Sequence, residues 1–286
     1  MRIDLHTHTT ASDGVLAPAA LVEEARRWGV EVLAVSDHDT TAGLDEALGA
    51  GAALGVEVWP AVELSCDVEA GEVHMLGYFV DRTLDWFQAL LSRLRDGRSL
   101  RARRMVERLA ALGVPVEFDR VRQIAGEAAI GRPHVARALV EAGRVRTVAE
   151  AFDRFIGRHG PAYVERVKVT PLQAVDVIRA AGGLAVLAHP GWGGQEGMVP
   201  ALVAGGLDGI EVYHPDHTPD QVRAYAALAG RYGLLVTGGT DFHGGGLATR
   251  VNVGSQYVPE HVLPPLRAAA ARRRPGAPPV LDLAVE

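Results

Sequence analysis

The segment DLHTHTTASDG, residues 4–14, places two histidines one residue apart and an aspartate five residues after the second of them. In an extended segment alternate side chains lie on the same face, so His6 and His8 point in the same direction. Two adjacent imidazoles contribute little to an apolar core, whereas imidazole nitrogens are common ligands of transition metals. The opening of the chain therefore predicts a metal site, with Asp13 in the loop that follows.

Residues of the same chemical types recur near the ends of other apolar runs. They are Asp37, His38 and Asp39 in VSDHDT, Glu63 in AVELS, His74 in EVHML, His189 in LAHPG, and Asp241 with His243 in GGTDFHGGG. Each alone has an ordinary structural explanation, because a single histidine in a strand is usually hydrogen-bonded in the core and an aspartate after a strand usually caps a helix or a turn. Their recurrence in run after run instead predicts one shared metal centre.

Short apolar runs alternate with amphipathic ones along most of the chain. The pattern predicts strands at 3–5, 30–36, 56–65, 71–80, 184–190, 207–215 and 234–244, and helices at 18–29, 42–55, 170–183 and 218–233. This alternation is typical of a parallel α/β sheet with helical crossovers, and seven strands in this order favour a closed or nearly closed barrel. Barrel enzymes gather their catalytic groups where the strands end, so the metal-type residues should converge on one mouth.

A helical block interrupts the alternation between residues 84 and 167. It contains WFQALLSRLRDGRSLRARRMVERLAALG, GRPHVARALVEAG and VAEAFDRFIG, which read as helices. We interpret residues 84–167 as an inserted helical cap subdomain over the mouth of a barrel domain formed by residues 1–83 and 168–286.

The composition excludes several other classes of protein. With 286 residues, 48% of them hydrophobic, the chain can bury one large core. The net charge of −6 argues against broad, non-specific binding of nucleic acid. A single cysteine, Cys66, excludes an internal disulfide and a cysteine-rich zinc site. Without a signal-like or membrane-spanning run, we expect a soluble, cytoplasmic protein with no membrane partner.

The motifs DLHTHTTASDG, VSDHDT, VELS, LAHP and GTDFHG closely resemble those of the polymerase and histidinol phosphatase (PHP) superfamily, from the first strand to about residue 246. This resemblance implies a distorted seven-stranded (β/α) barrel with a trinuclear metal centre held by nine ligands. The matching residues are His6, His8, Asp13, His38, Glu63, His74, His189, Asp241 and His243. The resemblance also implies that Glu63 bridges two metals and that Asp13 and His38 help to hold the third.

The donor set fits phosphate ester hydrolysis. Imidazole and carboxylate ligands without thiolate suit two to three divalent Mn, Fe or Zn ions better than Mg or Ca alone. Neighbouring ions can hold a hydroxide that attacks phosphorus, and they neutralise the charge of the phosphate. We therefore expect catalysis to depend on His6, His8, Glu63, Asp241 and His243. Each of the nine ligand positions of the PHP motifs has a matching residue in this sequence.

The insert and the motif spacing resemble the branch of nucleoside 3',5'-bisphosphate phosphatases that also act as 5'-to-3' exoribonucleases (RNase AM-like). The resemblance implies removal of the 3'-phosphate of a substrate such as adenosine 3',5'-bisphosphate (pAp), and degradation of short RNA without a stable nucleic-acid complex. It places Arg132 and His134 at a substrate phosphate, which the planar fork of arginine suits. The alternative for Arg132 is a solvated residue at a helix start. His159 and Tyr163 are expected to be packing groups.

Seven arginines between residues 93 and 108 form a basic run on one predicted helix. Arg98 and Arg101 share a helical stripe with Leu94 and Met105, which would turn them inward to guide phosphates into the mouth. We therefore include Arg101 among the substrate-binding candidates. His214 and His217 follow the sixth predicted strand, and either one is a leaving-group acid or both are ordinary loop histidines.

Two other functions stay open. One is a phosphatase of a small metabolite such as histidinol phosphate. The other is a non-catalytic metal-binding or regulatory module, which the complete ligand set disfavours.

Overall fold

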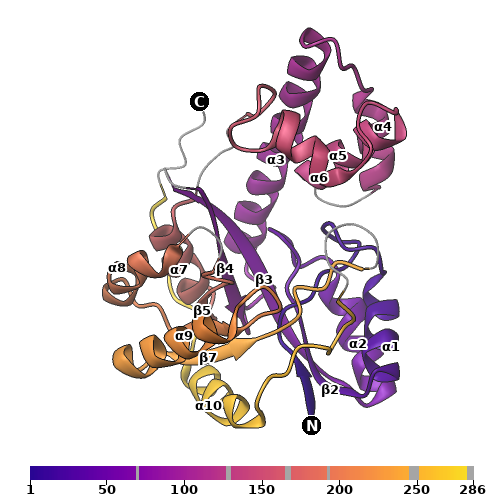
Figure 1. The fold of residues 1–286 in the computed structure, drawn as a ribbon. Helices are drawn as coiled ribbons and strands as arrows, with labels where there is room; N and C mark the ends of the chain where they lie inside the picture. The colour runs from indigo at the N-terminus through magenta and orange to yellow at the C-terminus, as the bar shows by residue number, and fades with distance from the viewer. Residues whose placement is uncertain (69–70, 127–129, 165–168, 192–193, 245–250, 282–286) are drawn as a thin grey trace.

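The computed structural model describes residues 1–68, 71–126, 130–164, 169–191, 194–244 and 251–281. One sheet contains seven strands in chain order. They are β1 (Arg2–Asp4), β2 (Val30–Val35), β3 (Glu57–Val68), β4 (Gly71–Tyr78), β5 (Leu184–Leu187), β6 (Gly209–Tyr213) and β7 (Leu235–Gly238). The α-helices are α1 (Pro18–Arg27), α2 (Leu44–Leu54), α3 (Asp85–Ala111), α4 (Phe118–Ala125), α5 (Arg132–Glu141), α6 (Val148–Ala151), α7 (Pro171–Ala180), α8 (Val199–Ala204), α9 (Pro219–Tyr232) and α10 (Leu263–Arg272). Figure 1 shows α1 and α2 beside the first strands and α7, α8 and α9 beside the later ones.

The α/β class and the seven strands are as the sequence predicts, but the expectation of an all-parallel sheet is wrong at β4. This strand runs antiparallel to both β3 and β5, while the other neighbouring pairs are parallel. The reason is the connection, because β3 ends at Val68 and β4 begins at Gly71. Two residues can close a hairpin, whereas a parallel crossover needs a dozen or more.

The position of Glu63 also differs from the prediction. It was expected at a strand end, but β3 continues for five more residues, to Val68. The ladder with β2 stops at Pro60, and Glu63 forms one more parallel bridge, with His38 beyond the end of β2, while the remainder of β3 pairs with β4, up to Val68 opposite Gly71. The hairpin of β3 and β4 therefore extends beyond the parallel strands, and Glu63 lies in its middle.

The two edges of the sheet approach each other just beyond β1 and β7. The Leu5 amide donates to the Gly238 carbonyl at 3.1 Å, and Thr7 forms a parallel bridge with Phe242. Within the described residues the edges are joined by these contacts and not by a ladder between the two strands. A Cβ atom at Gly239 would lie 2.3 Å from the His6 amide nitrogen, so this close approach requires glycine. The sheet is therefore strongly curled, as a nearly closed barrel requires.

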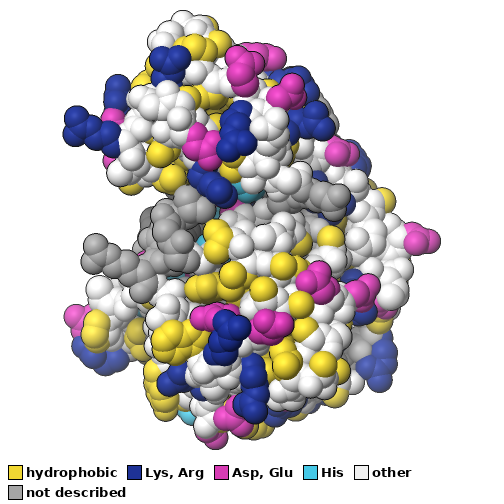
Figure 2. All heavy atoms as spheres, turned by 90° about the vertical axis from the view of Figure 1, so that its right-hand side faces the viewer, with side chains coloured by type: hydrophobic (Ala, Val, Ile, Leu, Met, Phe, Trp, Pro, Cys, Tyr) yellow, Lys and Arg dark blue, Asp and Glu magenta, His cyan; other side chains and the backbone are white. Residues whose placement is uncertain are grey.

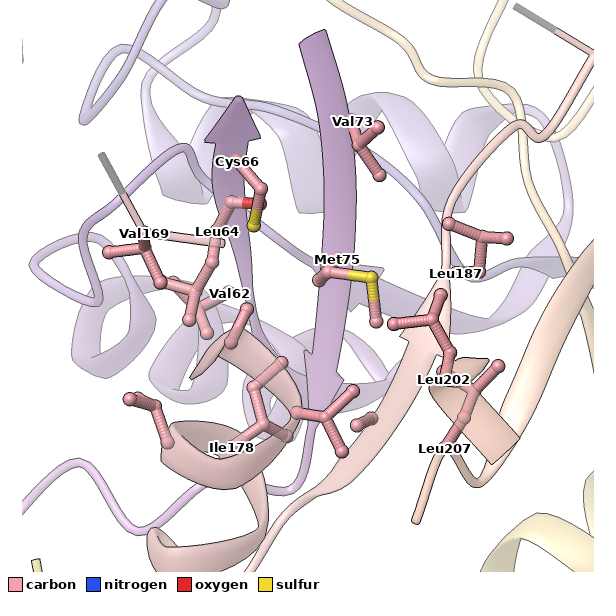
Figure 3. Packing of buried hydrophobic residues seen from close by; sticks show 14 of the residues in the cluster. Val62, Leu64, Cys66, Val73, Met75, Val169, Ile178, Leu187, Leu202 and Leu207 are labelled. Carbon is pink, nitrogen blue, oxygen red and sulfur yellow. The ribbon is translucent and has the colours of Figure 1, made fainter. Parts of the chain in front are cut away.

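Both faces of the sheet are buried. On β2, Val32 belongs to the cluster inside the curled sheet, while Leu33 belongs to the cluster beneath α1 and α2. Figure 3 shows the outer cluster at the hairpin, whose members include Leu64 of β3, Met75 of β4 and Ile178 of α7. Strands buried on both faces read as continuous apolar runs, which explains why they were visible in the sequence.

The helices α3 to α6 and a π-helical turn, Phe152–Ile156, lie between β4 and α7 in the chain. Figure 1 shows them above the sheet, with the long α3 leading up to the others. From Ala102 onward they share a separate hydrophobic cluster, which includes Met105, Leu139 and Ile156, whereas the first half of α3, with Phe87 and Leu91, packs in the cluster at the hairpin. The boundary expected at residues 167 and 168 lies outside the described residues.

Among the described helices, none is both long and apolar enough to cross a membrane.

Candidate metal centre and phosphate pocket

The nine predicted ligands lie close together at one rim of the sheet. Six follow strand ends, whereas Glu63 and His74 lie within the hairpin and Asp13 lies in the loop before α1. Because β4 is antiparallel, its beginning lies on the rim where the parallel strands end. The reversal that the sequence did not predict is thus what brings His74 to the others.

The centre of this group consists of two imidazoles and two carboxylates. Nε2 of His6 lies 3.2 Å from Oε2 of Glu63 and 3.3 Å from Oδ1 of Asp241, and Nε2 of His8 lies 3.1 Å from both oxygens. All four atoms are buried, and none has a hydrogen-bond partner among the described residues. Donor atoms bound at about 2.1 Å to one ion would be separated by about 3–3.5 Å. The four atoms therefore fit a shared divalent cation.

Two further groups adjoin this one. Asp13 lies among His8, His38 and His243, with Nε2 of His243 at 3.3 Å from its Oδ1. On the other side, Oε1 of Glu63 lies 2.9 Å from Nδ1 of His74 and 3.2 Å from Nε2 of His189.

Glu63 thus directs its two oxygens to two different sets of imidazoles. A carboxylate placed in this way can bridge two ions. The cluster as a whole can bind metal ions.

The electrostatics of the cluster favour cations. Burial by itself would raise the pKa of Glu63, but the surrounding imidazoles hold that pKa well below its usual range. The pKa of Asp241 is also well below its usual range, because His6 and His243 outweigh its burial. Burial opposes a charge on His243 as well, yet Asp13 and Asp241 raise its pKa to about 10. These carboxylates are ionised at neutral pH, and bound metal ions would take the place of the imidazole protons.

Glu211, on β6, was not predicted from the sequence. It is fully buried, its Oε1 lies 3.2 Å from Nδ1 of His6, and its Oε2 accepts the His189 amide at 2.8 Å. A proton held on Nδ1 by this carboxylate leaves the Nε2 lone pair of His6 free for a metal. The signal in the sequence was a single acid inside the apolar strand GIEVY.

Two other buried aspartates hold the loops that carry ligands. Asp37 was a ligand-type candidate, but it accepts bonds from the Thr9 amide, the Thr9 hydroxyl and the Ser12 hydroxyl at 2.8, 2.7 and 2.6 Å. It therefore fixes the loop of Asp13. Asp4 does the same for the loop of Asp241, since it accepts the Thr240 amide at 2.9 Å and hydroxyl at 2.6 Å.

Three non-glycine residues of the site have a left-handed backbone. The φ angles are +52° at Asp39, +24° at His189 and +51° at Asp241. Such conformations cost on the order of 1–3 kcal/mol each and persist only where surrounding contacts enforce them.

A cavity of about 360 Å³ lies between the ligand cluster and the insert. Its lining includes His38, His74 and Asp241 on one side and Arg98, Arg101 and Arg132 on the other. Figure 2 shows histidine side chains at the notch between the two lobes of the molecule, with a basic side chain above them.

The three arginines differ in how they are held. Nε of Arg98 donates to Asp39 at 2.6 Å, and Nε of Arg101 donates to the Val164 carbonyl at 2.7 Å. Arg132 forms an ion pair with Glu72, and its guanidinium lies 5.3 Å from the centre of the Phe152 ring.

The other candidates are mostly held by neighbouring groups. His134 is buried, and its Nδ1 accepts the Gly131 amide at 2.9 Å, which caps α5. Tyr163 packs under Arg101, with the guanidinium carbon 5.1 Å from the ring centre. The expectation that His159 is a packing group is wrong, because its side chain is exposed.

His214 and His217 have different surroundings. Nδ1 of His217 lies 2.9 Å from the Val212 carbonyl, and its Nε2 accepts the Gly191 amide at 3.3 Å, so both ring nitrogens are used structurally. Nε2 of His214 instead lies 3.7 Å from Oδ2 of Asp241, at the edge of the ligand cluster.

Comparisons with known proteins agree with this arrangement. The PHP domain model matches residues 4–125. A 3',5'-nucleoside bisphosphate phosphatase of Chromobacterium violaceum is 35% identical over 94% of this chain and 97% of its own length. The chain belongs to the PHP family. It is a hydrolase that acts on phosphate esters, and the family expected from the motifs is confirmed.

Other relatives show the range of this PHP group. The 5'-3' exoribonuclease Rnm of Escherichia coli is 37% identical over 84% of both chains. A phosphoribosyl 1,2-cyclic phosphate 1,2-diphosphodiesterase of Eggerthella lenta is 37% identical over 84% of this chain and 94% of its own. Among solved structures, a metal-dependent phosphoesterase from Bifidobacterium adolescentis superposes with a TM-score of 0.85 at 33% identity, over 93% of this chain and 96% of that one.

Proposed function

We propose that this PHP protein hydrolyses the 3'-phosphate of nucleoside 3',5'-bisphosphates such as pAp, and that it also degrades short RNA from the 5' end. One observation carries the proposal: one cavity is lined by Asp13 and Asp241, each with a buried carboxylate oxygen that has no hydrogen-bond partner among the described residues, and also by three arginines of the insert. One phosphate can lie at the donors while a second phosphate meets the arginines. The bisphosphate phosphatase and the exoribonuclease among the relatives act on substrates of this kind.

The proposed metal ligands are the nine residues of the cluster, which would hold two to three Mn, Fe or Zn ions. In this proposal His6, His8, Glu63 and Asp241 hold one ion, Glu63 with His74 and His189 a second, and Asp13 with His38 and His243 a third. Three groups of donor atoms that lie close together support that number, and His189 adjoins the group of His38, Glu63 and His74, because its Nε2 lies 3.2 Å from Oε1 of Glu63. When bound, the ions supply Lewis-acid activation of water and neutralise the phosphate.

The residues of the chain prepare the substrate for that chemistry. Arg101 and Arg132 would bind the non-reacting phosphate, and Arg98, held by Asp39, would add a fixed positive charge beside it. Guanidinium groups fixed in advance stabilise phosphate charge without reorganising during the reaction. Glu211 keeps the Nε2 atom of His6 directed at the reacting side.

The size of the cavity supports a small substrate. At about 360 Å³ it lies within the range of pockets that enclose drug-sized molecules. A mononucleotide, or the terminal nucleotide of an RNA strand, would fit, and a duplex would not. A nucleotide substrate is also consistent with the cytoplasmic location that we propose.

We also propose that residues 84–167 form a cap subdomain on a barrel made of 1–83 and 168–286. The separate hydrophobic cluster that begins at Ala102 supports a cap, and the first half of α3, with Phe87 and Leu91, anchors it in the cluster at the hairpin of the barrel. Contacts to the barrel side include Arg98 with Asp39, Arg132 with Glu72, and Arg158 with the Val68 carbonyl at 2.8 Å. Polar tethers of this kind hold a cap in place while leaving room for a substrate beneath it.

The test is a substrate panel assayed with Mn²⁺. It contains pAp, histidinol phosphate, 5'-phosphorylated short RNA and a ribosyl 1,2-cyclic phosphate. We expect the highest kcat/KM with pAp, activity on the short RNA, and release of the 3'-phosphate to give AMP. A preference for histidinol phosphate would assign the protein to small-metabolite dephosphorylation instead, and a preference for the cyclic ester would make it a phosphodiesterase.

A further inference from the structure

Glu72 lies between the cap and the ligand cluster, in a place that the proposed chemistry does not require. It is the second residue of β4, and its side chain lines the cavity. Its Oε2 pairs with Arg132 of α5, and its Oε1 lies 3.8 Å from Nε2 of His74. The backbone carbonyl of Glu72 accepts Nε2 of Gln195 at 3.0 Å, which fixes the main chain at this point.

This ion pair uses the guanidinium that a substrate phosphate would need. Arg132 is held between the Glu72 carboxylate and the Phe152 ring, and its side chain is 18% exposed. Phosphate and carboxylate bind guanidinium through the same planar fork. A phosphate can therefore bind Arg132 fully only if the carboxylate moves away.

The carboxylate partners of Arg98 and Arg132 differ in exposure and in side-chain length. Asp39, the partner of Arg98, is 1% exposed, has a short side chain and holds a left-handed backbone. Glu72 is longer and 25% exposed, so its carboxylate can turn into solvent. The pair of Arg98 and Asp39 is thus a fixed part of the wall, whereas the pair of Arg132 and Glu72 can open.

We propose that Glu72 is a specificity-determining residue that holds Arg132 until a substrate phosphate displaces it. The proposal rests on the proposed function, because it assigns the non-reacting phosphate to Arg132. Glu72 weakens the binding of any ligand whose phosphate cannot displace it. It also competes for Arg132 after hydrolysis, and so it promotes release of the 5'-monophosphate product.

The test compares the wild type with Glu72→Gln, Arg132→Ala and the double variant. The control is Glu141→Gln, whose carboxylate pairs with Arg120 at 2.7 Å on the exposed surface of the cap. Affinity for 5'-AMP and for inorganic phosphate is measured by calorimetry, and KM and kcat are measured with pAp. We expect Glu72→Gln to bind 5'-AMP about three- to tenfold more tightly and to lower KM by a similar factor, without raising kcat.

The double variant isolates the energetic coupling between Glu72 and Arg132. In the Arg132→Ala background, Glu72→Gln should change the affinity for 5'-AMP by less than about twofold, because the group that Glu72 holds is gone. Glu141→Gln should resemble the wild type.

Three results would overturn the proposal. Weaker 5'-AMP binding by Glu72→Gln with a lower Tm would make Glu72 a structural tie of the cap. Unchanged affinity with a lower metal content would mean that it acts on His74. Absence of binding of either probe to the wild type would also contradict it. The proposed function can fail separately from this proposal. A wild type that binds 5'-AMP but does not hydrolyse pAp would exclude pAp as the substrate, and the 5'-AMP affinities of the variants would still test the role of Glu72.

Discussion

The carboxylate of Glu211 lies 3.2 Å from Nδ1 of His6, while the opposite nitrogen of the same ring faces the carboxylates of Glu63 and Asp241. The imidazole is therefore held from behind by a residue 205 positions away in the chain. All of these groups are buried, so contacts within the curled sheet, and not contacts with water, hold them in their relative positions.

Glu211→Gln tests this relationship. The amide keeps the shape of the side chain but removes the charge that makes His6 a better ligand. We expect metal affinity, or kcat at limiting metal, to fall about ten- to a hundredfold, with little change in KM. Metal titrations followed by activity and by elemental analysis measure this. The exposed Glu57→Gln should behave as the wild type, and normal metal affinity in Glu211→Gln would contradict the assigned role.

Metal removal is predicted to affect both activity and stability. We expect two to three transition-metal ions per chain by elemental analysis after mild purification, and loss of activity with a chelator that Mn²⁺ restores. Four buried donor atoms that lack hydrogen bonds to any described residue gain partners when ions bind, so the chelated protein should have a lower Tm. One ion or fewer at full occupancy would contradict the proposed centre.

Removal of single ligands should separate catalysis from folding. His6→Ala or Asp241→Ala is expected to abolish most hydrolysis of pAp, because each removes a donor from the central group. The hydrophobic clusters do not include these residues, so the far-UV circular dichroism spectrum and a cooperative melt should be retained. Wild-type activity in either variant would exclude that residue from the reaction.

Arg132→Ala tests the anchor for the second phosphate. A charge-assisted hydrogen bond to the non-reacting phosphate is worth about 1.5–3 kcal/mol, or roughly ten- to a hundredfold in kcat/KM for pAp. For 3'-AMP, which carries one phosphate, kcat/KM should hardly change. An equal loss with both substrates would place Arg132 at the reacting phosphate, and no loss with either would make it a helix-start residue.

Asp37→Ala is predicted to destabilise the protein. The substitution removes a buried carboxylate that accepts bonds from Thr9 and Ser12, and it leaves three buried donors without this partner. We expect the free energy of unfolding to fall by about 2–4 kcal/mol, measured by urea denaturation. The exposed Asp119→Ala, on α4, should change it by less than about 0.5 kcal/mol.

The sequence by itself determined the residue types of the site and the strands that carry them. His6 and His8 are visible because two imidazoles in an apolar strand context have few structural uses, and the alternation of apolar runs follows directly from burial on both faces of the sheet. The helical insert could also be predicted from the sequence, because the periodicity of a helix is a local property.

Only the tertiary structure decided how these residues are combined. The hairpin of β3 and β4 reverses one strand and places Glu63 between two groups of imidazoles. Glu211 behind His6 and Glu72 against Arg132 are pairs separated by 205 and 60 positions. Local patterns record which face of an element is buried. The partner of a polar group depends instead on how distant segments pack, and here that is set by the curling of the sheet for Glu211 and by the packing of the insert on the sheet for Glu72.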